Sequence, residues 1–186
     1  EESTPVSVLI VDDSALMRNL IGRIVENSSG LSVAGKAMNG EFALQKIPKT
    51  DPDVIILDLE MPQMNGIEFL KERKRLGIEI PVVILSSIAH RGAQITMEAL
   101  ALGASDFILK PTGSVSEEIR IVGSHIVETL LAYGNRYKQN RKTPRKETEP
   151  LPSREIRKTA PVIDKPRPQV SVPEIKDLPQ RKSAES

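Results

Sequence analysis

Three carboxylates and one amine follow short apolar runs at separate points of the chain. Asp12 and Asp13 come directly after the run at residues 8–11, and Asp58 closes the run at residues 54–58. Lys110 follows a later run, at residues 106–109. Crowded carboxylates repel one another unless a cation lies between them, and Mg²⁺ prefers oxygen ligands in octahedral geometry. The pattern therefore predicts a magnesium site beside a lysine, a set of groups that can handle phosphate.

Two alternating periodicities predict the elements that position these residues. Short Val/Ile/Leu-rich runs indicate buried strands near 7–11, 32–36, 54–58, 82–86 and 106–109. The segments between them are amphipathic, which is typical of βαβ units around a parallel sheet covered on both faces. In open α/β sheets, ligands bind outside the carboxyl ends of the strands, where the strand order reverses. We therefore expect the residues at these ends to meet: Asp12, Asp13, Asp58, Ser86 and Lys110.

The helices are read from apolar spacing and from their end signals. The first begins at the N-cap candidate Ser14, and its apolar face is expected to hold Leu16, Leu20, Ile21, Ile24 and Val25. Others are expected near 40–47, 65–76 and 92–102. A fifth helix carries a single stripe that suits packing on the sheet, made of Val115, Ile119, Val122, Ile126, Leu130, Tyr133 and Tyr137. Charge and proline follow it, which places the domain boundary near residue 138.

The near-neutral total charge hides two different parts of the chain. Residues 1–134 carry 12 Lys/Arg against 18 Asp/Glu, whereas residues 135–186 carry 14 against 7 and hold 8 of the 14 prolines. The second part has no glycine and one aromatic residue, so it cannot bury a core. We expect a disordered N-terminus at 1–5, a folded domain at 6–138 and a disordered, Pro- and charge-rich flexible linker at 139–186.

Composition also disfavours several classes of function. Acidic residues are interspersed with the cations of the tail, which favours a solvated linker over a nucleic-acid or membrane partner. The chain has no cysteine, so disulfides and thiolate metal sites are excluded. No apolar run reaches the ~18 residues of a membrane span, and we expect a cytoplasmic protein. His90 and His125 are expected in a loop and on a helix surface, and no glycine loop of the P-loop type is visible.

Four groups of residues resemble the motifs of two-component response-regulator receiver domains. They are Ile10–Ser14, Leu57–Pro62 with Asn65-Gly66, Leu85–Ser87 and Leu109–Pro111. Within that family, a second set resembles the regulatory half of chemotaxis protein-glutamate methylesterases (CheB): Glu60-Met61-Pro62, Ser86-Ser87, Arg91-Gly92 and Gly103–Phe107. The match covers roughly residues 6–134. It implies an α/β fold with a five-stranded, parallel, doubly wound sheet, flavodoxin-like in strand order 2-1-3-4-5.

The resemblance assigns the nucleophile and the metal ligands. Asp58 is implied to be the phosphoacceptor, which takes a phosphoryl group from a histidine kinase or a small acyl phosphate. Mg²⁺ would be bound by Asp58, by Asp13 directly, by Asp12 mainly through water, and by the backbone carbonyl of Glu60. The metal would neutralise charge on the transferred phosphoryl oxygens, so no dedicated general base is needed.

The resemblance also implies a phosphate clamp and a switch. Lys110 would pair with one phosphate oxygen and the Ser86 hydroxyl would donate to another, and the Lys110–Pro111 bond would be cis. Movement of Ser86 would let Phe107 rotate inward and so bias a surface made by the last two helices and the last strand. Taken from the pattern alone, Phe107 is a core residue. Asp12 could likewise merely cap a helix, and Lys110 could merely pair with it.

The implied role of the parent protein depends on a domain that this sequence does not contain. In the methylesterase family, the receiver blocks a C-terminal methylesterase/deamidase domain that acts on methyl-accepting chemotaxis receptors, and phosphorylation by a CheA-like histidine kinase relieves the block. No Gly-x-Ser-x-Gly-like nucleophile turn follows residue 138. This chain is then expected to have only phospho-Asp chemistry of its own. The start at Glu1 favours a fragment that ends in the interdomain linker.

Other interpretations stay open. The chain could be the receiver of a DNA-binding response regulator, which a helix-turn-helix pattern after the linker of the parent protein would support, or a standalone receiver with a long tail. It could also be a Mg²⁺-dependent phosphatase or hydrolase with an Asp nucleophile. That class usually needs an acid/base two residues after the nucleophile, and Glu60 is the only candidate. Multiple turnover on a phosphate monoester would support this last interpretation.

Overall fold

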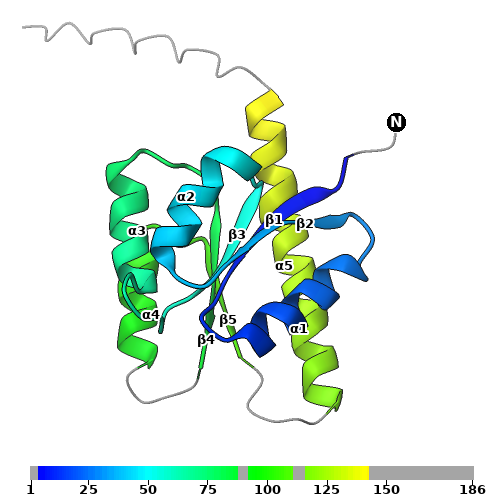
Figure 1. Ribbon diagram of the computed structural model, residues 1–186. Helices are drawn as coiled ribbons and strands as arrows, with labels where there is room; N and C mark the ends of the chain where they lie inside the picture. Colours follow the sequence, from blue (N-terminus) through cyan, green and yellow to red (C-terminus); the bar gives the residue numbers. More distant parts are fainter. Residues whose placement is uncertain (1–3, 88–91, 111–115, 143–186) are drawn as a thin grey trace, which may run out of the picture. The chain divides into compact units, whose positions relative to one another are not determined.

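The computed structural model describes residues 4–87, 92–110 and 116–142 (Figure 1). Strands and helices alternate along this part of the chain, as the sequence predicts. The strands are β1 (Val6–Val11), β2 (Leu31–Ala37), β3 (Val54–Asp58), β4 (Val82–Ser86) and β5 (Asp106–Leu109). The helices are α1 (Ala15–Glu26), α2 (Gly40–Thr50), α3 (Gly66–Arg75), α4 (Gly92–Ala101) and α5 (Ser116–Lys142).

The five strands form one parallel sheet in the order β2-β1-β3-β4-β5. This confirms the predicted fold class and strand order. The chain moves outward from β1 to β2, then returns to place β3 on the other side of β1. The strand order therefore reverses at the carboxyl ends of β1 and β3, which is where ligands bind in sheets of this kind.

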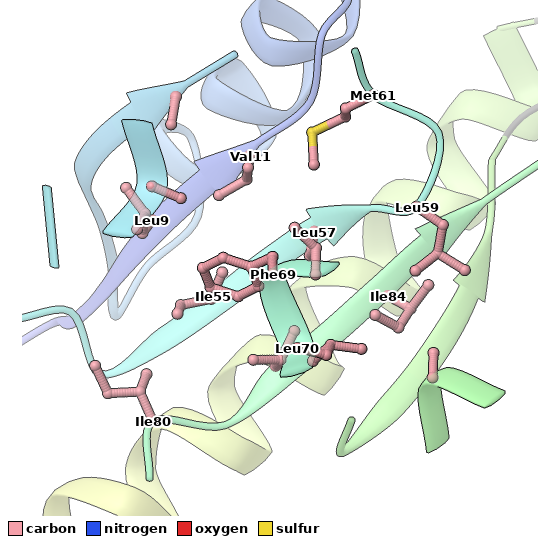
Figure 2. Close-up of a cluster of buried hydrophobic side chains, with 14 of the residues drawn as sticks. Leu9, Val11, Ile55, Leu57, Leu59, Met61, Phe69, Leu70, Ile80 and Ile84 are labelled. Carbon is pink, nitrogen blue, oxygen red and sulfur yellow. The ribbon is translucent and has the colours of Figure 1, made fainter. Parts of the chain in front are cut away.

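Helices cover both faces of the sheet because successive side chains of a strand point to opposite faces. In β3, Ile55 belongs to the core beneath α2, α3 and α4, where Phe69 of α3 is completely buried (Figure 2). The next residue, Ile56, belongs to the core beneath α1 and α5, together with Ile21 and Leu130. Each fully buried side chain of this size contributes about 1.5–3 kcal/mol relative to exposure. These two cores hold the strand ends, and the residues on them, in fixed positions.

The first helix begins as predicted, and its predicted apolar face is buried or half-buried except at Leu16. Ser14 is its N-cap, and the Ser14 Oγ accepts a hydrogen bond from Met17 N at 3.3 Å. Ile21 and Val25 are buried, whereas Leu16 is 81 % exposed, so the prediction for Leu16 was wrong. At 100° per residue, Leu16 lies about 140° around the helix from Ile21. Met17 packs against the core in its place.

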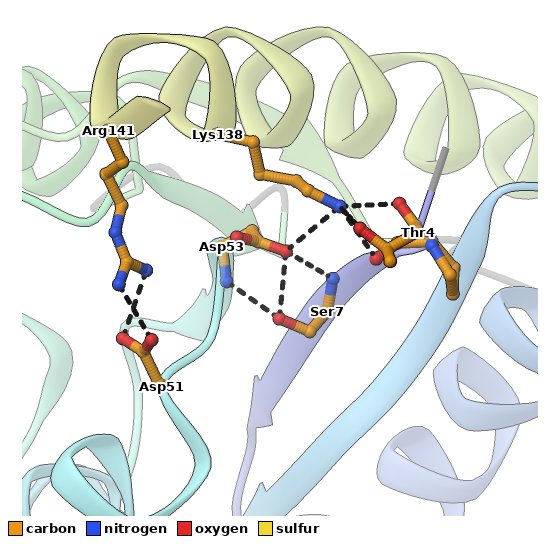
Figure 3. Close-up of polar contacts among 7 residues, drawn as sticks. Thr4, Ser7, Asp51, Asp53, Lys138 and Arg141 are labelled. Carbon is orange, nitrogen blue, oxygen red and sulfur yellow. Dashed lines mark hydrogen bonds and ion pairs between the residues drawn. The ribbon is translucent and has the colours of Figure 1, made fainter. Parts of the chain in front are cut away.

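The last helix continues through Lys142, so the predicted boundary near residue 138 falls inside it. Its final turns contact the segment between α2 and β3 (Figure 3): Lys138 Nζ lies 3.9 Å from Asp53 Oδ2, and Arg141 donates two hydrogen bonds to Asp51, at 2.8 and 3.1 Å. Residues 1–3 and 143–186 lie outside the described residues, so the domain limits stay predictions. Although α5 is long, the helices in the described ranges include none with a stretch apolar enough to span a membrane.

Candidate functional site

The carboxyl ends of β1 and β3 bring the three predicted acids together. Carboxylate oxygens of Asp12, Asp13 and Asp58 all lie within 4.8 Å of one another. Val11 pairs with Leu57 in the sheet, and the residue after each of them is an aspartate, so the strand register itself brings Asp12 and Asp58 together. These two side chains are buried, at 1 % and 3 % exposure, whereas Asp13 is exposed.

Lys110 reaches the two buried acids from the end of β5. Its Nζ lies 2.9 Å from Asp12 Oδ2 and 2.8 Å from Asp58 Oδ2. The backbone of β4 fixes its position, because Lys110 N donates a hydrogen bond to Ser86 O at 2.7 Å. The long side chain then spans from β5 past β4 to the acids on β3 and β1. Lys110 contacts two of the three carboxylates, so these four side chains together carry a net negative charge when ionised.

For both Asp58 and Lys110, burial and the contact between them shift the pKa in opposite directions. Burial raises the pKa of Asp58, because the charged carboxylate is poorly solvated there; the hydrogen bond and the charge of Lys110 lower it in part, and the charge of Asp12 raises it. Burial would lower the pKa of Lys110, but its hydrogen bonds and charge interactions with Asp12 and Asp58 outweigh burial and raise it. Lys110 is therefore a cation at neutral pH, and a further cation would favour ionised Asp58.

The acidic oxygens fit a hard divalent cation. Asp12 Oδ1 accepts a hydrogen bond from Ser14 N at 2.8 Å. Asp12 Oδ2 is buried, and the ammonium of Lys110 lies 2.9 Å from it. Lys110 also contacts Asp58, so one ammonium is shared between two buried carboxylates and offsets their charge only in part. Asp12, Asp13 and Asp58 together offer the oxygen ligands that Mg²⁺ takes.

The loop between β3 and α3 is held against Asp58 by backbone contacts. Glu60 N donates a hydrogen bond to Asp58 Oδ1 at 3.2 Å. Gly66 closes the loop, because its N donates to Leu59 O at 3.1 Å. A Cβ at residue 66 would lie 2.6 Å from Asp58 O, closer than real Cβ atoms approach, so the position needs glycine. Asn65 caps α3 in a capping box, which fixes where the loop ends.

The two predicted switch residues differ in solvent exposure: Ser86 is buried and Phe107 is exposed. Ser86 is 7 % exposed, and among the described residues its Oγ makes one long contact, 3.4 Å, to Ser87 O. Phe107 is 42 % exposed, so its assignment to the core from the pattern alone was wrong. The reason is that β5 is the edge strand of the sheet, where fewer neighbouring side chains cover each residue. The role of these two residues as a switch stays a prediction.

Sequence reasoning missed two side chains that support the site. Arg18, one helical turn after the N-cap of α1, donates hydrogen bonds to the backbone carbonyls of Asp12 (2.7 Å) and Asp13 (2.9 Å). Side chains on a helix point back toward its N-terminus, so an arginine in the first turn of the helix could have indicated a contact with the residues before it. Ser87 Oγ donates to Glu60 Oε2 at 3.3 Å, a contact between two loops with no sequence signal.

Some predicted features lie outside the described residues. They include His90, Arg91 and Pro111, and with Pro111 the geometry of the Lys110–Pro111 bond. The other histidine, His125, is exposed on α5, as predicted.

Comparison with known proteins identifies the family. A family model described as the response regulator receiver domain matches residues 8–120. The chain belongs to the response regulator receiver family. A solved structure of the response regulator domain of Thermotoga maritima CheB is similar to this receiver, with a TM-score of 0.63 and 41 % sequence identity over 70 % of this chain and 97 % of that one.

Full-length relatives carry a more specific name. This receiver is 59 % identical over 145 residues to a protein-glutamate methylesterase/protein-glutamine glutaminase of Treponema pallidum, a match that covers 78 % of this chain and 36 % of the relative. It is 63 % identical over 132 residues to a protein of the same name from Treponema denticola, over 71 % and 36 % of the two chains. The chain thus spans about a third of the length of these relatives.

Proposed function

We propose that Asp58 accepts a phosphoryl group in two-component signalling. The observation that supports this most is a buried Asp58 carboxylate within 4.8 Å of two further acids and 2.8 Å from Lys110. In this proposal, Asp12, Asp13, Asp58 and the backbone carbonyl of Glu60 hold Mg²⁺. When bound, the metal supplies a positive charge that stabilises the phosphoryl oxygens during transfer.

Asp58 reacts in its ionised form. One of its carboxylate oxygens forms a bond to phosphorus, while the bond from phosphorus to the donor's histidine nitrogen, or to the oxygen of an acyl phosphate, breaks. The leaving group takes the electron pair of the broken bond, and the product is an aspartyl phosphate. Burial raises the pKa of Asp58, whereas Lys110 lowers it, so the lysine helps to keep the nucleophile ionised before transfer.

Lys110 changes partners during the reaction. Before transfer its ammonium lies between Asp12 and Asp58. After transfer the charge is carried by the phosphoryl oxygens, about −1.5 to −2 at pH 7, so the ammonium moves onto one of them as a point charge. The Ser86 hydroxyl would give up its 3.4 Å contact with Ser87 O and donate to another phosphoryl oxygen.

The proposed output surface is formed by α4, β5 and α5. Four large apolar side chains on these elements are exposed: Met97 (67 %), Phe107 (42 %), Leu109 (45 %) and Ile121 (62 %). Movement of Ser86 toward the phosphoryl group would allow Phe107 to turn inward and so change this surface. Two pre-existing states that differ by a few kcal/mol are enough for such a switch.

The named relatives support a specific parent protein and partners. They are methylesterase/glutaminase enzymes, and this receiver covers only 36 % of each. We propose that the receiver regulates a C-terminal methylesterase/deamidase domain that acts on methyl-accepting chemotaxis receptors, and that a CheA-like histidine kinase is the phosphodonor. The alternatives are a DNA-binding effector domain and a standalone receiver, and the sequence of the parent gene after the linker distinguishes all three.

A mass measurement after incubation with acetyl phosphate and MgCl₂ tests the chemistry. The native chain should gain one phosphoryl group, and Asp58→Asn should gain none. Lys110→Ala should retain part of the gain, and Asp13→Ala should lose Mg²⁺ binding. Asp53→Asn is the matched control, because Asp53 is also a buried aspartate and directly precedes β3, at the end of the strand opposite to Asp58. An undiminished gain in Asp58→Asn would refute the assignment, and multiple turnover on p-nitrophenyl phosphate would instead support the phosphatase interpretation.

A further inference from the structure

Asn39 connects two loops at the carboxyl edge of the sheet. It follows β2, caps α2 and is 1 % exposed. Its Oδ1 accepts a hydrogen bond from Phe42 N at 3.0 Å, which is the helix cap. Its Nδ2 donates a hydrogen bond to Oε1 of Gln63, 24 residues away in the loop between β3 and α3. The side chain thus makes one contact within its own helix and one to the loop that follows Asp58.

Gln63 has a backbone conformation that its own side chain disfavours. Its φ is +67°, in the left-handed region. Residues other than glycine, asparagine and aspartate enter this region at a cost of about 1–2 kcal/mol and persist there only when neighbouring structure holds them. The loops touch at a second point, where Gly40 N donates to Met64 O at 3.0 Å. A Cβ on Gly40 would lie 2.7 Å from Met64 Cγ, so this approach is close.

These contacts hold the middle of the β3–α3 loop, which also carries Glu60. The ends of the loop are held by hydrogen bonds from Glu60 N to Asp58 Oδ1 and from Gly66 N to Leu59 O. We propose that Asn39 and Gln63 are positioning residues for the metal site. Their side-chain contact holds the turn at Gln63 and thereby sets the direction of the Glu60 backbone carbonyl. This inference rests on the proposed function, in which that carbonyl is a Mg²⁺ ligand.

Helix capping alone does not account for both groups of the Asn39 amide. Aspartate caps helices about as well as asparagine, and only the side-chain oxygen is used for the cap. The amide donor is used across the loops instead. Outer residues that orient metal ligands typically change metal affinity by about 10- to 100-fold when they are lost. Because the Gln63 side-chain oxygen is used in the hydrogen bond from Asn39, its effect on Mg²⁺ would act through the loop.

A double-mutant cycle separates this role from capping and from charge. In Gln63→Glu, the new carboxylate still accepts from Asn39. In Asn39→Asp, the cap remains and the Gln63 amide can rotate to donate to the new carboxylate. Only the double variant, Asn39→Asp with Gln63→Glu, has no donor between the two side chains, although each retains nearly its native size. Each added carboxylate attracts Mg²⁺, so electrostatics alone would make the double variant bind the metal more tightly.

The experiment measures the Mg²⁺ dissociation constant of the full chain by calorimetry, and urea unfolding in EDTA. We expect both single variants to bind Mg²⁺ within about twofold of the native chain or more tightly, and the double variant about tenfold more weakly. A double variant that binds at least as tightly as the single variants overturns the inference, as does a lower urea midpoint with an unchanged dissociation constant. Should the double variant not fold, Gln63→Ala adds no charge and should bind about fivefold more weakly; native affinity in it overturns the inference. A native chain that does not bind Mg²⁺ at all overturns the proposed function as well.

Discussion

Lys110→Met tests the electrostatics of the acidic group most directly. Methionine keeps an unbranched side chain of similar length but removes the ammonium 2.8–2.9 Å from two carboxylates that are 1 % and 3 % exposed. At an effective dielectric constant of about 20, the Coulomb attraction of each contact is about 6 kcal/mol before the cost of desolvation is subtracted. Removal of one partner from a buried ion pair costs about 3–5 kcal/mol in practice. We expect about 3 kcal/mol, because Asp58 can relieve the loss by binding a proton.

The variant should respond to pH and to Mg²⁺ in a specific way. Without Lys110, the pKa of Asp58 rises further, so the deficit in the free energy of unfolding should shrink as the pH is lowered and the carboxylate is protonated. The lysine also competes with Mg²⁺ for Asp12 and Asp58, so the variant should bind the metal more tightly. At about 100 times the dissociation constant, a bound ion adds about 2.7 kcal/mol. Saturating MgCl₂ should therefore recover most of the lost stability.

The assay is urea unfolding followed by far-ultraviolet circular dichroism, in EDTA and in MgCl₂. With a slope of about 2 kcal/mol/M, a loss of 3 kcal/mol lowers the midpoint by about 1.5 M. Lys71→Met is the control, because Lys71 and Glu98 form an exposed ion pair, 3.5 Å apart, that should contribute under about 1 kcal/mol. The reasoning is wrong if Lys110→Met matches this control in EDTA, or if Mg²⁺ stabilises Lys110→Met less than the native chain.

Three further predictions follow from other contacts. Asp58→Asn should raise the urea midpoint in EDTA at neutral pH. An acid whose pKa is raised by folding binds its proton more tightly when folded, so its contribution to the free energy of unfolding falls as the pH rises from the unfolded pKa through the folded one. A midpoint no higher than the native one contradicts this. Gly66→Ala should lower the free energy of unfolding by about 1–3 kcal/mol and slow phosphorylation, because its Cβ would lie 2.6 Å from a backbone oxygen. Gly35→Ala is the control, because its Cβ would have neighbours no closer than 3.4 Å and should not clash. Equal losses in the two variants would argue against the close approach. Arg141→Ala removes both hydrogen bonds to Asp51, and amide hydrogen exchange in the last turn of α5 should accelerate about two- to fivefold; unchanged exchange would show that these contacts do not hold the turn.

Strand and helix positions were predictable because they depend on local patterns. Side chains alternate along a strand and recur every three to four residues in a helix, so the apolar spacing indicated each element and its approximate ends. The position of Asp58 at the end of an apolar run also indicated the site, because parallel strands bring their carboxyl ends to one edge of the sheet. Leu16 shows the limit: a short helix offers several possible apolar stripes, and only the packed sheet selects one.

Contacts between separate loops depended on the tertiary structure alone. Lys110 could have paired with any of the three acids, and the sheet order places its Nζ between Asp12 and Asp58. The contact between Asn39 and Gln63 has no sequence signal, since neither residue type at these positions predicts the other. The sequence by itself determined which residues end the strands, because strand ends depend on the local spacing of apolar residues. Which of those side chains touch was decided by the packing of helices and loops around the sheet, where interactions far apart in sequence compete.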